Sequence, residues 1–365
     1  MRQHTSSAPH GPRLPGTAGR RARSAVPHPY GRSRAVAVLA ATALGAALLT
    51  ACGAGDPGSD GTVTVGVGSN IFELPIRLAD ANGYFARQGL KVKFVTLNAS
   101  TGISALQSGS VQFLNDSPTD FVSAVAKNVP VTAIAADGVG NPLGLIVSTD
   151  FAKRHGLTAA TPAAQVAKAL AGSTGGASSN NTKAETGLFL TSYGVAKDAV
   201  KWVSLPTPAA DKAALKSHQI DWFTTSEPAP LQIQQEGDGV VVADATKVPA
   251  WSNARTGYSE VVVARKSYLS QHAGTARKFA TAVQQATAYM NAHLDSPTVR
   301  AVARKALPGV PADVLESSLR LVDWPARGSM SAEGWKTALA FINSLDALPQ
   351  TAEVTADDWT DAYLP

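Results

Sequence analysis

The chain has 365 residues, of which 44% are apolar, 16% charged and 6% aromatic. This composition is typical of a globular protein large enough for two domains, and it excludes an intrinsically disordered one. The formal net charge is +5, but seven basic residues and no acidic residue precede Cys52, which leaves 25 basic against 27 acidic residues from Cys52 onward. Phosphate binding needs basic residues clustered on the folded part of a protein, and that part has no excess of basic residues here. We therefore do not expect nucleic acid to be a partner.

The first 51 residues have the features of an export signal. Residues 1–34 are basic and free of carboxylates, and residues 35–49 form an apolar run without a charge. Fifteen helical residues rise about 22 Å, less than the roughly 30 Å of a hydrocarbon core, so the run predicts a signal peptide and not a permanent span. The pair Arg20-Arg21 leaves twin-arginine export open beside the general route.

Cys52 is the only cysteine in the chain. A single cysteine excludes an internal disulfide, a thiolate zinc site and an iron–sulfur cluster. The sequence Leu49-Thr50-Ala51-Cys52 resembles the lipobox of bacterial lipoproteins, in which the cysteine becomes the lipidated N-terminus after cleavage. The resemblance implies that Cys52 is a lipid anchor, that residues 52–61 are a flexible spacer, and that the protein stays on the outer face of the cell membrane. The alternative is an ordinary signal peptide with an incidental cysteine.

Short strands alternate with helices after the spacer. The pattern predicts strands at residues 62–67, 92–97, 111–115 and 131–136, and helices at 73–82, at 102–108 and from Pro118 onward. Gly83 ends the first of these helices, since glycine is favoured directly after a helix. Helices of about ten residues between strands predict an α/β fold with mainly parallel sheets.

The part of the chain after about residue 261 is predicted to be helical. Two sets of apolar residues recur there at a spacing typical of helices that face a core. The sets are Phe279, Ala282, Val283, Ala286, Met290 and Leu294, and Trp335, Ala338, Leu339, Ile342 and Leu345. We expect these residues to pack in the core and to contact no ligand.

Two segments of the chain repeat one pattern. Residues 92–97 (VKFVTL) are echoed by 200–205 (VKWVSL), and residues 105–114 (ALQSGSVQFL) by 214–223 (ALKSHQIDWF). A polar loop and a proline follow in both copies, so both are predicted to fold as strand, helix, strand, polar loop and helix. We therefore expect two related α/β lobes. Ligands of such sheets bind beyond the carboxyl ends of the strands, so the predicted site is a cleft between the lobes.

Polar residues that follow the strands of the first copy are the candidate ligand contacts of that lobe. They are Ser69, Asn70, Phe72, Ser100, Thr101, Asp116 and Ser117. The hydroxyl and amide groups can donate to an oxyanion, with Phe72 as a wall, but the same residues at helix starts can act only as caps. Asp116 would repel an anionic ligand unless it is paired.

The second copy and the segment after it supply the other candidates. They are Ser179, Asn181, Thr182, Thr224, Thr225, Glu227, Trp251 and Arg255. The first three open a helix expected to run through Tyr193; a flexible linker is the alternative. Glu227 can accept a hydrogen bond from an amine or ring N–H of a ligand, or it can act only as a carboxylate that stabilises the start of a helix. Arg255 can pair with a sulfonate or carboxylate, or be a solvated arginine, and Trp251 would line the cleft.

Motifs typical of enzymes and cofactor sites are missing from the sequence. Ile71 stands where a dinucleotide fingerprint needs its third glycine, and residues 172–182 lack the Gly-Lys-Ser/Thr ending of a phosphate-binding loop. The four histidines after Cys52 lack ligand spacing, and no Gly-x-Ser-x-Gly elbow occurs. We expect no metal, no cofactor and no catalytic residue.

Several short motifs together resemble a known family. They are Gly-Tyr-Phe at residues 83–85, Gly-Leu at 89–90, ALQSG at 105–109 and the pair Glu227-Pro228. The pattern is similar to that of type II solute-binding proteins of ABC importers, in the nitrate, taurine and alkanesulfonate group, which includes binders of thiamine-pyrimidine precursors. The resemblance covers about residues 62–265. One departure is Gln112, where the group often has an acidic residue.

The resemblance implies an organisation in lobes. It implies a two-lobed periplasmic-binding-protein type II fold, each lobe a mainly parallel sheet flanked by helices. Lobe 1 would comprise residues 62–142 plus 258–365, and lobe 2 residues 143–257. Two crossovers, near residues 138–145 and 244–259, would form a hinge on which the lobes close around a ligand.

The resemblance also implies a function. The protein would be the lipid-anchored, monomeric binding component of an ABC importer, and it would bind its solute without turnover. A sulfonate, a nitrate-like anion or a pyrimidine-type compound would be captured in the cleft and delivered to a membrane permease with a cytoplasmic ATPase. The alternatives are a surface ligand sensor and an enzyme on the same fold. The cysteine- and histidine-bearing motifs of pyrimidine synthases that resemble this group are missing here.

Overall fold

The computed structural model describes residues 61–68, 70–97, 99–205, 207–345, 348 and 350–365, without the side chains of Ala99 and Ser100. The predicted signal peptide, Cys52 and all but the last residue of the predicted spacer lie outside these ranges. None of the helices within them combines the length and the apolar character that a bilayer crossing requires.

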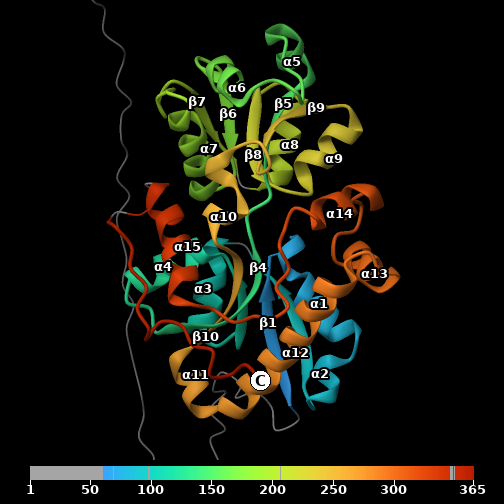
Figure 1. Ribbon diagram of the computed structural model, residues 1–365, viewed down its shortest axis with the longest axis vertical. Coiled ribbons are helices and arrows are strands. Elements are labelled where there is room, and N and C mark those ends of the chain that lie inside the picture. The colour runs from blue at the N-terminus through green and yellow to red at the C-terminus, as the bar shows by residue number, and fades with distance from the viewer. Residues whose placement is uncertain (1–60, 69, 98, 206, 346–347, 349) are drawn as a thin grey trace, which may run out of the picture. The chain divides into compact units, whose positions relative to one another are not determined.

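The described residues contain two five-stranded sheets (Figure 1). The first sheet has the strand order β2-β1-β3-β10-β4. Its strands are β1 (Thr62–Val67), β2 (Lys91–Thr96), β3 (Phe113–Asp116), β4 (Val131–Val139) and β10 (Tyr258–Arg265). The pairs of β1 with β2 and β3 are parallel, whereas β10 is antiparallel to both β3 and β4. Strand β10 is thus the one reversed strand between parallel neighbours.

The second sheet repeats this topology with the order β7-β6-β8-β5-β9. Its strands are β5 (Leu143–Ser148), β6 (Thr174–Ala177), β7 (Lys201–Ser204), β8 (Trp222–Ser226) and β9 (Gly239–Asp244). Strand β5 is antiparallel to β8 and β9, as β10 is to β3 and β4, and β6 is parallel to β7 and β8. The repeated sequence blocks form β2 and β3 in one sheet and β7 and β8 in the other, so the predicted repeat of an α/β architecture is confirmed.

Helices connect and flank the strands (Figure 1). In the first part of the chain they are η1 (Ile71–Glu73), α1 (Leu74–Ala81), α2 (Tyr84–Arg87), α3 (Ala99–Ser108) and α4 (Pro118–Ala126). Between β5 and β10 they are α5 (Thr149–His155), α6 (Ala163–Leu170), α7 (Asn180–Ser192), α8 (Pro208–Lys216), α9 (Ala229–Glu236), η2 (Pro249–Trp251) and α10 (Asn253–Thr256). The last five are α11 (Lys266–Gln271), α12 (Ala273–His293), α13 (Pro297–Ala306), α14 (Ala312–Leu319) and α15 (Ala332–Ser344). The helix predicted at 102–108 begins three residues earlier.

Side-chain caps place polar residues where strands end and helices begin. The Ser117 hydroxyl accepts the backbone N–H of Asp120 at 3.1 Å, at the start of α4, and Pro118 occupies the first turn, where its missing N–H costs nothing. Ser148 caps α5 in the same way, accepting from the N–H of Phe151 at 3.2 Å. The chain therefore turns from strand to helix on hydroxyl-bearing residues.

Both faces of the first sheet are covered by helices that come from distant parts of the chain. On one face Phe113 of β3 stacks on Phe279 of α12 at 4.0 Å between ring centroids, and Phe279 stacks on Phe85 of α2 at 5.0 Å. On the other face Trp335 of α15 lies 5.3 Å from the ring of Phe121 in α4. All five rings are buried, and each buried aromatic side chain stabilises the fold by about 1.5–3 kcal/mol or more.

The two apolar stripes predicted in the last third of the chain are core residues, with two exceptions. Their other members are buried, whereas Leu294, just after α12, and Leu339 of α15 are half-buried and pack against the core. The prediction of a core role for these stripes is confirmed.

The chain passes between the two sheets twice. It leaves β4 at Val139 and enters β5 at Leu143, and it returns from β9 through η2 and α10 to β10. The two passages are joined directly, because the N–H of Gly140 donates to the carbonyl of Gly257 at 2.7 Å. The Ser259 hydroxyl also donates to the Gly140 carbonyl.

Candidate functional site

Three acidic side chains lie at one edge of the first sheet. Asp116 is the last residue of β3, Asp137 lies near the end of β4, and Glu260 lies near the start of the antiparallel strand between them. Val261 is opposite Asp116, and Glu260 is opposite Gly138, so the register brings the carboxyls of three adjacent strands to the same end. This is the carboxyl edge, where α/β sheets carry their ligand sites.

These carboxyls are buried and repel one another. Asp116 and Glu260 are each 6% exposed and Asp137 is fully buried. Burial raises the pKa of Asp137 to about 8 and, together with repulsion by Asp120, raises the pKa of Asp116 well above its ordinary value. Burial raises the pKa of Glu260 in the same way, and repulsion by Asp116, Asp137 and Asp120 adds to the rise.

Two asparagines donate to this group of acids. The Asn115 side-chain amide donates to Asp137 Oδ2 at 2.7 Å, and the Asn70 side chain hydrogen-bonds Glu260. One buried oxygen of each acid, namely Asp116 Oδ2, Asp137 Oδ1 and Glu260 Oε2, has no hydrogen-bonding partner among the described residues, and neither has Asn115 Oδ1. A native protein rarely leaves several buried polar atoms unpaired, so these acceptors make this edge a candidate ligand site.

The second sheet carries a polar group at its own carboxyl edge. Ser179 and Thr182 form a capping box at the start of α7, with the Ser179 hydroxyl accepting from Thr182 N–H at 3.0 Å and the Thr182 hydroxyl from Ser179 N–H at 3.2 Å. One turn on, the Asn181 amide donates to Glu185 Oε1 at 2.9 Å, while Asn181 Oδ1 has no partner among the described residues. The serine and threonine thus act as caps, and Asn181 keeps a free acceptor.

Glu185 connects this helix to the crossover. Its Oε1 also accepts from the Asn141 side-chain amide at 2.8 Å, and Asn141 Oδ1 in turn accepts from the Ser226 hydroxyl at 2.9 Å. Asn141 lies in the passage from β4 to β5, so a single amide joins α7, β8 and the crossover. Burial raises the pKa of Glu185 to about 8.

The end of β8 supplies Thr224, Thr225 and Glu227, all buried. Glu227 Oε2 accepts from the N–H of Leu231 at 2.9 Å, at the start of α9, and burial raises the Glu227 pKa to about 8. Thr224 Oγ1 has no partner among the described residues. Glu227 therefore has a structural bond through one of its oxygens, whereas Thr224 has an unused hydroxyl.

The other predicted contacts fall in different environments. Trp251 is fully buried in the core, 5.3 Å from Phe189, and its indole N–H donates to the Glu185 carbonyl at 3.1 Å, so it packs the interior and lines no open surface. Phe72 is also a core residue. Arg255 is exposed and forms no ion pair with a described residue, and Thr101 is exposed. Ser69 lies outside the described residues, as does the side chain of Ser100.

The sequence-based candidates thus form two groups. Asn70 and Asp116 come together with Glu260 and Asp137. Asn181 bonds Glu185, which Asn141 joins to Ser226 of β8, next to the candidates Thr225 and Glu227. Asp137, Glu185 and Glu260 were missed as candidates. A signal was present, because Asp137 and Glu260 interrupt the apolar strand sequences VTAIAADGV and YSEVVVAR, where an acid is not expected without a role.

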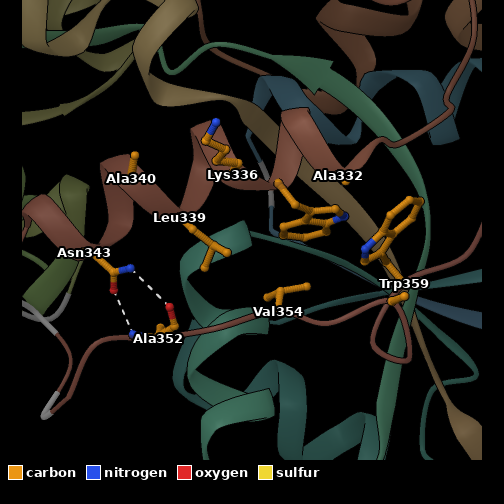
Figure 2. A pocket seen from close by; sticks show the side chains of 10 residues that line it. Ala332, Lys336, Leu339, Ala340, Asn343, Ala352, Val354 and Trp359 are labelled. Carbon is orange, nitrogen blue, oxygen red and sulfur yellow. Dashed lines mark hydrogen bonds between the residues drawn. The ribbon is translucent and has the colours of Figure 1, made fainter.

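A cavity of about 410 Å³ lies elsewhere, between α15 and the C-terminal segment (Figure 2). Trp335, Leu339 and Trp359 give it apolar walls, and the Asn343 amide bonds the backbone of Ala352 at 2.8 and 3.1 Å. None of the carboxyls described above lines this cavity. Within the described part of the chain, no group of three or more His, Cys, Asp or Glu residues is placed to hold a metal ion.

Comparison with known proteins shows the family of the chain. The model of the family described as "NMT1/THI5 like" matches residues 72–296. The chain belongs to this family. In this NMT1/THI5-like protein, residues 72–296 include all of β2 to β10 and with them Asp116, Asp137 and Glu260, whereas β1 and Asn70 precede the matched range. No curated protein matches the chain at a significant level.

Solved structures of known proteins share the fold of this NMT1/THI5-like protein. The ligand-binding component of an ABC-type import system from Staphylococcus aureus, with zinc bound, is 14% identical, with a TM-score of 0.66 over 83% of this chain and 97% of that one. The periplasmic aliphatic sulphonate-binding protein SsuA from Escherichia coli is 15% identical, with a TM-score of 0.65 over 83% and 98%. The periplasmic nitrate-binding protein NrtA from Synechocystis PCC 6803 is 16% identical, with a TM-score of 0.59 over 71% and 70%. These matches agree with the resemblance found in the sequence, and they confirm the fold that it implies, with two α/β halves flanked by helices.

Proposed function

We propose that this protein is the solute-binding component of an ABC importer, which captures a small polar molecule and hands it to a membrane permease. The observation that carries the proposal is the set of buried, unpaired polar atoms at the carboxyl edge of each sheet, at Asp116, Asp137, Glu260, Asn181 and Thr224. Polar atoms that the protein leaves unpaired are available to a ligand. The family and the shared fold with import proteins support the same reading.

The mechanism we propose is binding without turnover. Lobe 1 comprises residues 62–142 plus 258–365 and lobe 2 residues 143–257, and the two crossovers act as a hinge. A ligand that contacts both carboxyl edges favours the closed arrangement over the open one by the difference of its affinities for the two. The permease then recognises the closed, loaded protein, and the ATPase drives release on the other side of the membrane.

The same proposal includes export and anchoring. The apolar run at residues 35–49 directs the chain out of the cytoplasm, and acylated Cys52 holds the processed protein, as a monomer, on the outer face of the membrane. The acyl chains contribute about 0.8 kcal/mol per buried CH₂ group, so two or more of them hold the protein firmly.

The test starts from the full-length chain expressed in a bacterium fed with labelled palmitate, with the processed product purified without denaturation. We expect label on the wild type and none on Cys52→Ser. Native mass spectrometry is expected to show one retained small molecule per chain, which is released unchanged and raises the melting temperature when added back. At one hundred times its Kd such a ligand adds about 2.7 kcal/mol to the stability. Chemical conversion of the solute, or a folded protein with no retained molecule that no cell extract stabilises, would contradict the proposal.

A further inference from the structure

We propose that the captured solute carries a positively charged nitrogen, and that Asp116, Asp137 and Glu260 hold this charge at the carboxyl edge of the first sheet. The inference rests on the proposed function and deepens it by naming the charge class of the solute. A cation differs in charge from the sulfonate and the nitrate after which two structurally similar binding proteins are named.

The position of the three carboxyls carries the first step. They come from three adjacent strands, with β10 between β3 and β4, and the pairing of Val261 with Asp116 and of Glu260 with Gly138 brings them to one edge. All three are at least nine-tenths buried. Each keeps one oxygen without a partner among the described residues. Asp116 and Asp137 are also close enough to Glu260 to raise its pKa, so N–H groups of one ligand could bond to more than one of these free oxygens.

The absence of a balancing charge carries the second step. None of the three carboxyls forms an ion pair with a described residue, and the groups that act on Glu260 are Asp116, Asp137, Asp120 and the neutral amide of Asn70. Lys127 acts on Asp120, at the start of α4, and is not among the groups that act on Glu260, Asp116 or Asp137. Taking an unpaired carboxylate out of water is costly, so the group must either hold protons or meet a cation.

The donors already in place argue against an anion. The Asn115 amide is engaged by Asp137, and the Asn70 side chain by Glu260. Of the described side chains at this edge, only the protonated acids could still donate to a sulfonate or nitrate, and once ionised they would repel it. An ammonium, amidinium or aminopyridinium group brings both the charge and the N–H donors that the free oxygens can accept.

An organic cation fits better than a metal ion. Among the residues that the structure describes, no cluster of three His, Cys, Asp or Glu side chains has the geometry to hold a metal. An organic cation, which meets each oxygen through its own N–H group, does not need such a geometry. Strong N⁺–H···O⁻ bonds can form to oxygens that a metal could not contact together.

Protons and a cationic ligand compete for the same oxygens, so the direction in which the affinity changes with pH can be predicted. Burial and mutual repulsion raise the pKa of all three acids, that of Asp137 to about 8. At neutral pH the empty site therefore holds protons, which a cation must displace. Cation affinity should rise as the pH rises from 6 to 8, whereas an anion that uses the protonated acids as donors should bind better as the pH falls.

The experiment uses the processed full-length protein, freed of any retained molecule by dialysis, with six probes. Benzamidine, putrescine and 4-aminopyridine are the cations; nitrate, methanesulfonate and acetate are the anions. We expect at least one cation to raise the melting temperature at pH 7.5, with an affinity at least tenfold higher at pH 8 than at pH 6. No anion should stabilise the protein.

Two variants test the residues. Asp137→Asn and Glu260→Gln keep the shape of the protonated acids, so they should fold, and we expect each to weaken the binding of the active cation at least tenfold. The control is Glu353→Gln, which alters an exposed acid and should bind as the wild type does. Wild-type-like affinity in both site variants would overturn the inference, as would stabilisation by an anion alone or by no cation. The native mass spectrometry proposed above detects a retained solute of either charge. A retained anion would contradict the inference but would still support the proposed function. If a site variant fails to fold, the wild-type pH profile still decides.

Discussion

At the scale of single residues, buried acids dominate the chemistry of this protein. Glu185 shows the effect without any ligand, because it lies in the core at 1% exposure and its neighbours are the amides of Asn141 and Asn181. Two hydrogen bonds favour its charged form, but burial outweighs them and raises its pKa from 4.5 to about 8. The protein thus keeps this side chain protonated in neutral solution.

Glu185→Gln is expected to make the stability less dependent on pH. Between pH 4.5 and 8 the unfolded chain has released a proton that the folded protein still holds. The free energy of unfolding therefore falls as the pH rises through this window, by up to about 1.4 kcal/mol per pH unit, and levels off above it. Glutamine removes this contribution. Urea unfolding at pH 5, 6, 7 and 8 measures it, with the exposed Glu353→Gln as control. Parallel pH profiles for wild type and Glu185→Gln would show the expectation to be wrong.

At the scale of elements, the junctions from strand to helix combine structural and binding roles. Ser179 caps α7 through a bond of 3.0 Å to Thr182 N–H, and Ser148 caps α5 through a bond of 3.2 Å to Phe151 N–H. A cap of this kind satisfies a backbone N–H that the helix leaves free. Of these two junctions, only that of α7 has an unpaired acceptor beside it among the described residues, at Asn181.

Ser179→Ala and Ser148→Ala are expected to cost similar stability and to differ in binding. Each removes one cap and should lower the free energy of unfolding by about 1 kcal/mol. The midpoints of urea unfolding measure this cost. Affinity for the retained solute should fall only in Ser179→Ala, because α7 carries the candidate contact Asn181 and α5 carries none. Equal loss of affinity in both variants would mean that the α7 junction has no part in the site.

At the scale of the whole molecule, two crossovers connect the two sheets, and a glycine in each crossover allows the two segments to approach closely. Gly140 and Gly257 both have positive φ, +94° and +74°, and the N–H of the first donates to the carbonyl of the second. A Cβ at Gly257 would lie 2.9 Å from the backbone of Ala338 in α15. The return crossover thus packs against α15 with no room for a side chain.

Gly257→Ala is expected to destabilise the whole protein by about 2–6 kcal/mol, since backbone strain and overpacking each cost about 1–3 kcal/mol. The matched control is Gly156→Ala, at the end of α5. Gly156 also has a positive φ, +62°, but nothing lies within 4 Å of the added Cβ. Its cost should stay near 1 kcal/mol, from the backbone alone. Thermal and urea unfolding measure the free energy of unfolding of both variants. An equal loss of stability in the two would show that close packing at the crossover adds no cost.

The sequence by itself determined the α/β class, the repeat of one architecture and several polar junctions, because these features depend on local periodicity and on residues that follow a strand directly. It placed Asn70, Asp116 and Asn181 among the candidate contacts in this way. Only the tertiary structure decided that β10 enters the first sheet between β3 and β4, and so brings Glu260 beside Asp116 and Asp137. Pairing between strands far apart in the chain leaves no periodic trace in either one. The charge that the site offers its ligand depends on that pairing, because burial among other acids, and not the presence of an acid, raises these pKa values.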